Sequence, residues 1–125
     1  MLDRVDPELV PPLQAFMELM GGGGISVRDL AATRAQMAAM DQAQLASLPE
    51  IPGIAVTDHQ VPGFDGAPEL LVRVYAPENA TGELPGLLWI HGGGYVIGNV
   101  QQDDFRCKGL ARSCGCVVAS VEYRL

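Results

Sequence analysis

The chain has 125 residues, a formal net charge of −7 at pH 7 and an apolar content of 48%. This length accommodates one domain, and this apolar content excludes wholesale disorder. The charge excludes a nucleic-acid surface, because such a surface needs clustered Lys and Arg, and the eight basic residues of the chain are scattered.

No apolar run approaches the length of a membrane span, and the first residues lack the charged start and apolar core of a signal peptide. We therefore expect a cytoplasmic protein without a membrane partner. Cys107, Cys114 and Cys116 form a poor disulfide framework, because they are odd in number and closely spaced. A zinc site of these cysteines with His91 is disfavoured, because Cys114 and Cys116 are closer in sequence than zinc ligands usually are. We expect neither a metal nor an organic cofactor.

The N-terminal part is predicted to be helical. Asp6 and Pro7 are typical of a helix start, with Asp as the cap and Pro in the first helical position. Pro11 and Pro12 are expected to distort or restart this helix, and the glycine run at 21–24 ends it as a plain linker. Apolar residues recur at helical spacing along it: Leu9, Val10, Leu13, Phe16, Met17 and Met20.

A second helix is predicted to open at residues 26–29, whose sequence Ser-Val-Arg-Asp resembles a capping box. One side of this helix is apolar and the other is polar. The apolar side contains Val27, Leu30, Ala31, Met37, Ala38 and Leu45.

After Pro49 the pattern changes to strands. The stretches "IAVTDHQVPG" and "ELLVRVYAP" predict two short strands joined through the turn-forming "GFDGAP". The run "GLLWIHGGG" predicts a strand buried on both faces, and "CVVASVEYRL" predicts another buried strand. Between them, "DDFRCKGLARSCG" predicts a helix that ends at Gly115. Strand, helix and strand at this spacing form a βαβ unit with parallel strands, so the fold class is α/β.

Three glycines follow His91 at the carboxyl end of the first strand of this unit, where open α/β sheets place ligands. Backbone N–H groups of glycines can turn toward a bound atom and form a cradle for a phosphate or for the oxyanion of an acyl-transfer intermediate. A dinucleotide fingerprint is disfavoured, because Ile97 stands where its third glycine is required and Gly98 comes one residue late. No Lys-Ser or Lys-Thr follows, as a phosphate-binding P-loop needs.

Histidine followed by three glycines after a third strand is the oxyanion-hole signature of lipases and esterases with the α/β-hydrolase fold. The chain resembles the bacterial hormone-sensitive-lipase-like carboxylesterases, which carry an N-terminal cap over the active site. The resemblance implies an N-terminal part of an α/β-hydrolase fold, with a mostly parallel sheet: cap helices in 1–48 and the first strands in 49–125. It rests on "HGGGY" at 91–95, on "IGN" with Asp103, Asp104 and Cys107 downstream, and on "GCVVASVEYRL" at 115–125, the start of the family's strand-four motif.

The resemblance also implies roles for single residues. Gly93 and Gly94 would donate the oxyanion-hole N–H groups, with Gly92 permitting the turn. His91 would orient the loop by hydrogen bonding rather than act as the catalytic base, and Tyr95 would line the acyl or alcohol pocket.

Further along the chain, the resemblance makes Asp104 and Tyr123 structural, and Glu122 stands where the family often has Asp. The implied reaction is hydrolysis of a small-molecule carboxylic ester, usually short-acyl, through a serine acyl-enzyme without a cofactor.

The catalytic triad is expected to be absent from this chain, because the sequence stops at Leu125, before the G-x-S-x-G elbow and the acid and histidine that follow it in such enzymes. Ser113 lies in an elbow-like A-x-S-x-G, but it ends a predicted helix, whereas the elbow ends a strand. His59 is interpreted as a solvent-exposed residue. Cys107 with His91 as base is a further alternative, although a mid-helix cysteine without nearby positive charge is usually inert.

The strand that carries the glycines is central in the related fold, so here it should expose an apolar edge with unpaired backbone groups. We expect the chain to be marginally stable, aggregation-prone, or completed by a second copy or by a complementing C-terminal chain. The alternative to an esterase is a non-catalytic binding or assembly module, in which the glycine cradle holds an anion or the open edge pairs with a partner chain.

Overall fold

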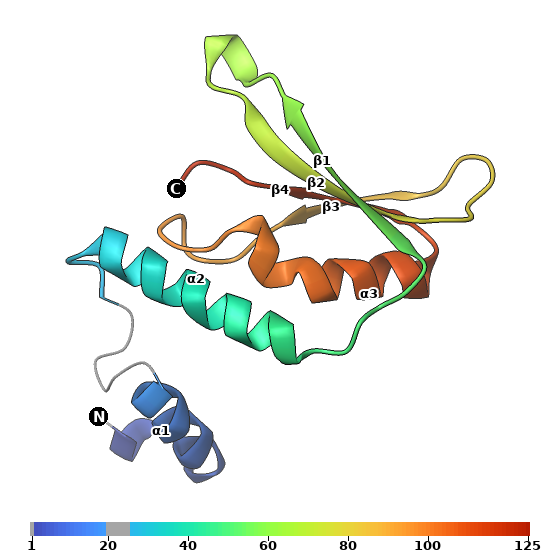
Figure 1. The fold of residues 1–125 in the computed structure, drawn as a ribbon. Coiled ribbons are helices and arrows are strands. Elements are labelled where there is room, and N and C mark those ends of the chain that lie inside the picture. Colours follow the sequence, from blue (N-terminus) through green and yellow to red (C-terminus); the bar gives the residue numbers. More distant parts are fainter. Residues whose placement is uncertain (1, 20–25) are drawn as a thin grey trace.

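The computed structural model describes residues 2–19 and 26–125 as three α-helices, a four-stranded sheet and short 3-10 turns (Figure 1). Among the helices in these residues, none combines the length and the apolar character needed to cross a bilayer. The helices are α1 (Val10–Leu19), α2 (Leu30–Ser47) and α3 (Asp104–Cys114). The strands are β1 (Ile54–Val61), β2 (Leu70–Pro77), β3 (Gly86–Ile90) and β4 (Val117–Val121). The 3-10 turns are Leu2–Arg4, Pro7–Leu9, Phe64–Gly66 and Val100–Asp103.

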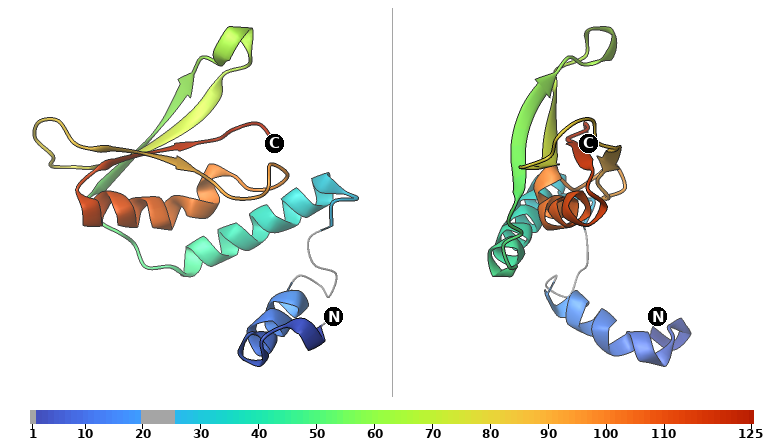
Figure 2. Two further views of the ribbon diagram at one scale, coloured as in Figure 1. Left: turned by 180° about the vertical axis from the view of Figure 1, so that it is seen from behind. Right: turned by 90° about the vertical axis from the view of Figure 1, so that its right-hand side faces the viewer.

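The first helix starts as its sequence predicts. The Asp6 carboxylate accepts a hydrogen bond from the Glu8 N–H, and Pro7 takes the first position of a 3-10 turn that becomes α1 at Val10. The two following prolines fall in the first turn of α1, where a missing N–H costs nothing, so the predicted restart is confirmed. No described side chain of α1 is buried, and Figures 1 and 2 show α1 away from the sheet. Met20 and the glycine run at 21–24 lie outside the described residues.

The second helix begins later than the capping box predicts. Its cap is Asp29, whose carboxylate accepts from the Ala32 N–H at 3.0 Å. Ser26 instead forms a local turn, in which its hydroxyl accepts from the Arg28 N–H, and its carbonyl accepts from the Thr33 hydroxyl at 2.7 Å. The prediction that Ser26 caps this helix is therefore wrong, because Asp29 is the side chain that lies within reach of the free N–H groups of the first turn.

The sheet has the strand order β1-β2-β4-β3. β1 pairs with β2 and β2 with β4 in antiparallel fashion, whereas β3 and β4 are parallel and are joined by α3. The α/β class and the βαβ unit are confirmed, and parallel pairing within the described residues is confined to β3 and β4. Gly115 ends α3 in the left-handed conformation, with φ of 59°, as predicted.

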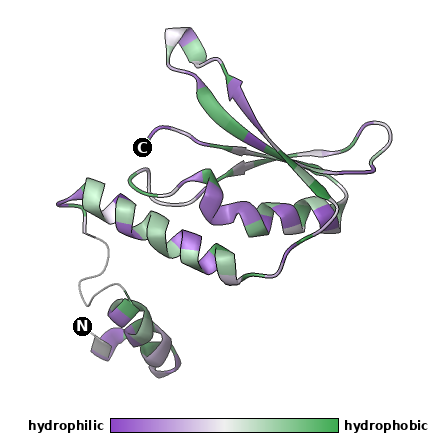
Figure 3. Ribbon diagram, in the orientation of Figure 1, coloured by the Kyte–Doolittle hydropathy of each residue, from purple (hydrophilic) through white to green (hydrophobic). Residues whose placement is uncertain are grey.

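The core lies between the sheet and α3, which runs along one face with α2 beside it (Figure 2). Figure 3 shows that β2 is mostly hydrophobic and α3 mostly hydrophilic, so α3 contributes only a narrow apolar side to this core. Burial of this cluster is the main driving force for docking α3 on the sheet. Its buried members are Tyr75, Cys107, Ala111, Cys116 and Val118.

β3 is an edge strand in the part of the chain that the structure describes. Leu87 and Trp89 pack against the core, but Leu88 and Ile90 on the opposite face are each 64% exposed. The prediction that this strand is buried on both faces is therefore wrong for the chain by itself, because no element in residues 26–125 covers the second face. The expected apolar edge is present.

A network of charged hydrogen bonds ties the sheet to the first turn of α3. The Arg73 guanidinium donates two bonds of 2.7 Å to Asp58 and two longer bonds to Asp104, and the buried Tyr75 hydroxyl also donates to Asp104. The bonds from Arg73 lower the pKa of the Asp58 carboxyl. Burial, reinforced by Asp104, raises the pKa of Tyr75. Two strands, β1 and β2, thereby fix the start of α3.

Replacement of Tyr75 by Phe tests this network. Tyr75→Phe removes one hydrogen bond to a charged, partly buried carboxylate, so the free energy of unfolding in urea should fall by about 1–3 kcal/mol. Tyr95→Phe is the matched control, because the Tyr95 side chain is 79% exposed; it should change stability by less than about 0.5 kcal/mol. Equal losses in the two variants would contradict the network.

Candidate active site in the glycine loop

The loop that links β3 to the 3-10 turn at Val100–Asp103 comprises residues 91–99, here called the glycine loop. It leaves the carboxyl end of β3, beside the end of the parallel strand β4. This is the edge of an α/β sheet at which ligands bind.

The backbone of the glycine loop requires glycine at its centre. Gly93 and Gly94 adopt φ of 135° and 62°, a region that favours glycine. A Cβ atom at Gly93 would lie 1.8 Å from the Ile97 carbonyl oxygen, which leaves no room for any side chain. Tyr95, which follows, is held at φ of 61° with its side chain 79% exposed.

A further glycine requirement lies at Gly98, which sequence reasoning noted but gave no role. Its φ is 104°, and a Cβ atom there would lie 2.4 Å from the Gly92 carbonyl oxygen and 2.7 Å from His91 Nδ1. Gly92, in contrast, has open space around its Cβ position and no left-handed φ. The turn therefore depends on Gly93, Gly94 and Gly98, rather than on Gly92 as the family resemblance implies.

Several adjacent N–H groups of the loop are free, and those of Gly93 and Gly94 are among them. The Gly93 carbonyl accepts the N–H groups of Val96 and Ile97, both at 3.1 Å, and so closes the turn. Within the described residues, neither the Gly93 N–H nor the Gly94 N–H donates to a protein acceptor. Free donors on successive residues of a left-handed turn form the kind of cradle that binds an anionic oxygen.

His91 lies beneath this cradle and is 2% exposed. Its Nδ1 is 2.9 Å from the Gly92 carbonyl oxygen, and because a carbonyl only accepts, Nδ1 carries the proton. The imidazole stacks on the Tyr123 ring at 4.2 Å, and the Tyr123 hydroxyl donates to the His91 carbonyl at 2.8 Å. The Tyr95 ring lies edge-on to the Tyr123 ring.

Two side chains outside the loop also hold its backbone, and a third holds the residue that follows it. The sequence assigned none of them to the site. Gln102 Nε2 donates to the Gly92 carbonyl at 3.2 Å, and Arg34 Nε, from α2, donates to the Val96 carbonyl at 2.9 Å. The Glu122 carboxylate accepts from the Val100 N–H at 2.7 Å. Glu122 belongs to a recognisable motif, whereas Arg34 lies 62 residues from its partner and carries no local signal.

The described residues show no serine–histidine pair. Ser113 lies in the last turn of α3 and its hydroxyl donates to the Gly109 carbonyl. The exposed His59 in β1 has Nε2 3.0 Å from the Thr57 hydroxyl. In the part of the chain that the structure describes, neither Ser113 nor His59 therefore lies in a hydrogen-bonded pair with the glycine loop.

Comparison with known proteins identifies the family. Residues 87–125 match a family described as alpha/beta hydrolase fold. A carboxylic ester hydrolase of Mycobacterium tuberculosis, LipN, is 35% identical over 94% of this chain and 31% of its own length. A bacterial heroin esterase structure superposes with a TM-score of 0.82 at 39% identity, covering 99% of this chain and 37% of that one.

The chain belongs to the α/β-hydrolase family. A hyperthermophilic esterase from Pyrobaculum calidifontis is also similar, with a TM-score of 0.71 and 32% identity over 96% of this chain and 36% of that one. The chain spans about a third of the length of these relatives.

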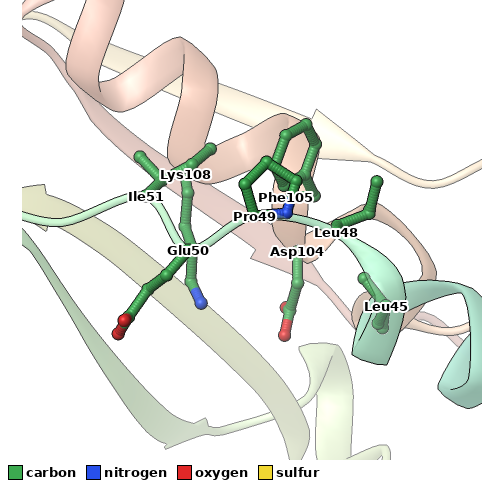
Figure 4. Close-up of a pocket in the computed structure, with 8 residues that line it drawn as sticks. All are labelled: Leu45, Leu48, Pro49, Glu50, Ile51, Asp104, Phe105 and Lys108. Atoms are coloured by element: carbon green, nitrogen blue, oxygen red, sulfur yellow. The ribbon is translucent and has the colours of Figure 1, made fainter.

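A surface hollow lies outside the glycine loop (Figure 4). It has a volume of about 260 Å³ and opens between the C-terminal end of α2, the segment that leads to β1, and α3. None of its lining residues belongs to the glycine loop, so it is not part of the candidate site. They are Leu45, Leu48, Pro49, Glu50, Ile51, Asp104, Phe105 and Lys108.

Cys107, the other candidate nucleophile, is fully buried in the core against the sheet. Burial, followed by the nearby Asp103 and Asp104 carboxylates, raises the pKa of its thiol to about 12. At neutral pH the thiol is therefore protonated and unreactive. In residues 2–19 and 26–125, no group of three or more His, Cys, Asp or Glu side chains is placed to hold a metal ion.

Alkylation distinguishes the three free cysteines of the chain. Cys114 is exposed, whereas Cys107 and Cys116 are buried. With iodoacetamide at pH 8, mass spectrometry of the folded protein should find the label at Cys114 alone. In urea all three should react, which serves as the control. Labelling of Cys107 at the rate of Cys114 in the folded protein would contradict its assignment as a packed, neutral thiol.

Proposed function

We propose that the glycine loop is the oxyanion hole of a hormone-sensitive-lipase-like carboxylic ester hydrolase. The observation that carries this proposal is the pair of free N–H groups on Gly93 and Gly94, held in a turn that no side chain at Gly93 would permit. His91 and Gly92 form the base of the hole through their hydrogen bond, and the exposed Tyr95 ring lines the acyl or alcohol pocket.

The chemistry that such a hole supports is acyl transfer. When a serine oxygen attacks the ester carbonyl carbon, the electron pair of the carbonyl moves to its oxygen, which becomes negatively charged. Two N–H donors fixed in advance stabilise this charge more than they stabilise the neutral ester, so they lower the barrier. Loss of one donor typically costs about 3–4 kcal/mol in the transition state.

The serine, histidine and acid of the triad are proposed to come from polypeptide outside residues 1–125. Within this arrangement, residues 1–48 form the cap and residues 49–125 the first strands of the catalytic core. The contact from Arg34 in α2 to the Val96 carbonyl supports a cap that meets the active site. The substrate is a small-molecule carboxylic ester, no cofactor takes part, and the free cysteines favour a cytoplasmic location.

A second candidate is a non-catalytic module that a partner chain or a second copy completes. The observation that favours it is the unpaired edge of β3, with Leu88 and Ile90 each 64% exposed. A nitrophenyl ester assay separates the two candidates, because a binding module would show no turnover when its partner is present.

A glycine pair in the loop provides the sharpest test of the proposed esterase. In the protein that carries this chain together with its nucleophile, Gly93→Ala should lower kcat for nitrophenyl acetate at least about 100-fold, because the new Cβ displaces the turn and both donors. Gly92→Ala makes the same chemical change where the space is open, and should retain activity within about threefold, a change of less than 1 kcal/mol. Equal activity of the two variants would exclude the proposed hole.

A further inference from the structure

We propose that Gln102 and Arg34 are positioning residues that set the directions of the two oxyanion donors, Gln102 for the Gly93 N–H and Arg34 for the Gly94 N–H. The proposal rests on the proposed function of the glycine loop. It assigns a task to two side chains that come from separate elements, the 3-10 turn at Val100–Asp103 and the cap helix α2.

The planarity of the peptide group links Gln102 to the Gly93 N–H. The Gly92 carbonyl and the Gly93 N–H belong to one trans peptide, so they point in opposite directions, and fixing one fixes the other. The Gly92 oxygen accepts from Gln102 Nε2 at 3.2 Å and from His91 Nδ1 at 2.9 Å. Two donors on one carbonyl oxygen hold the plane against rotation, which keeps the Gly93 N–H directed away from them.

Two peptide groups link Arg34 to the Gly94 N–H. The Gly93 carbonyl and the Gly94 N–H share the next peptide, and this carbonyl is held by the N–H groups of Val96 and Ile97. The Ile97 N–H in turn shares its peptide with the Val96 carbonyl, which accepts from Arg34 Nε at 2.9 Å. Arg34 therefore holds the Val96–Ile97 peptide, whose N–H binds the Gly93 carbonyl. In this way it fixes the Gly94 N–H indirectly.

Arg34 and Gln102 differ in how they are themselves held. The Gln102 N–H donates to the Asn99 side chain at 3.0 Å, so Gln102 is bound to the glycine loop at both its backbone and its side chain. Arg34 projects from α2, so a displacement of α2 would release the Val96 carbonyl. The Gly94 donor is thus coupled to the cap by a direct hydrogen bond from α2, whereas the Gly93 donor is coupled to it only through the packing of α2 on the 3-10 turn.

Steady-state kinetics of the protein that carries this chain with its nucleophile provides the first test. Gln102→Glu keeps the size of the side chain but replaces the N–H donor by an acceptor, and Gln101→Glu adds the same charge one residue earlier as its control. Arg34→Met keeps the stem without a donor, and Arg28→Met is its control on an exposed site. We expect Gln102→Glu and Arg34→Met to lower kcat between about tenfold and 100-fold. KM should stay within about twofold, because the donors act mainly in the transition state.

Amide NMR provides a measurement that does not depend on turnover. A residue with only a stabilising role would not shift one amide resonance selectively. Gln102→Glu should shift the Gly93 amide proton resonance and leave that of Gly94, whereas Arg34→Met should do the reverse. The two controls should leave both resonances unchanged, and the unfolding temperature of all four variants should match the parent protein.

The outcomes separate this proposal from the proposed function. If Gly93→Ala abolishes turnover while Gln102→Glu and Arg34→Met leave kcat and both resonances unchanged, the oxyanion hole stands and the positioning proposal is wrong. If Gly93→Ala retains turnover, the oxyanion hole is wrong, and the selective resonance shifts alone decide whether Gln102 and Arg34 set the two peptides. Shifts that are equal for a variant and its control overturn the proposal.

Discussion

The close approach of the Gly93 backbone to residues 96 and 97 is the constraint on which the site depends. The Gly93 carbonyl accepts two N–H groups at 3.1 Å, and the Cβ position of Gly93 is occupied by the Ile97 carbonyl oxygen. This contact makes the loop turn back on itself with the N–H groups of Gly93 and Gly94 on its free side. Three glycines lose more backbone entropy on folding than other residues would. Here that entropic cost is offset, because the loop needs backbone conformations that other residues would not adopt. The glycines therefore follow β3 directly.

Residues elsewhere in the chain support this turn through successive contacts. Tyr123 and His91 stack beneath it and bond to its first residues, and Glu122 holds the N–H of Val100 at its far end. The Arg73 network then fixes the first turn of α3, which follows the loop after the 3-10 turn at Val100–Asp103. The loop is thus clamped between the ends of two strands and the start of one helix, an arrangement that suits donors that must not move when charge develops.

Much of the fold could be predicted from the sequence because its signals are local. The Asp6–Pro7 start and Gly115 each report a backbone geometry within a few residues. Two errors have non-local causes. The cap of α2 falls at Asp29, since the Ser26 hydroxyl accepts from the Arg28 N–H and the Ser26 carbonyl accepts from the Thr33 hydroxyl seven residues on. β3 is half-exposed because burial depends on neighbouring elements that its own sequence does not encode.

The candidate site likewise contains residues that the sequence predicts and residues that it does not. The motif at 91–95 and the resemblance it carries predict the oxyanion donors, and the comparisons confirm the family. Arg34 could not be predicted, because its partner is 62 residues away, and neither could Gln102, whose side chain is one of several amides near the loop. The sequence draws attention to Gly98, because its spacing fits no nucleotide-binding fingerprint. Its close approach to His91 becomes clear only in the three-dimensional structure.

A crystal structure of the protein with its nucleophilic serine bound to a phosphonate ester, which mimics the tetrahedral intermediate, tests the oxyanion hole most directly. The phosphoryl oxygen should lie about 2.7–3.1 Å from the backbone nitrogens of both Gly93 and Gly94. The Gly92 carbonyl should remain bound to His91 and Gln102. A phosphoryl oxygen bound by other donors, or a Gly92–Gly93 peptide turned so that its carbonyl faces the phosphonate, would contradict the oxyanion hole.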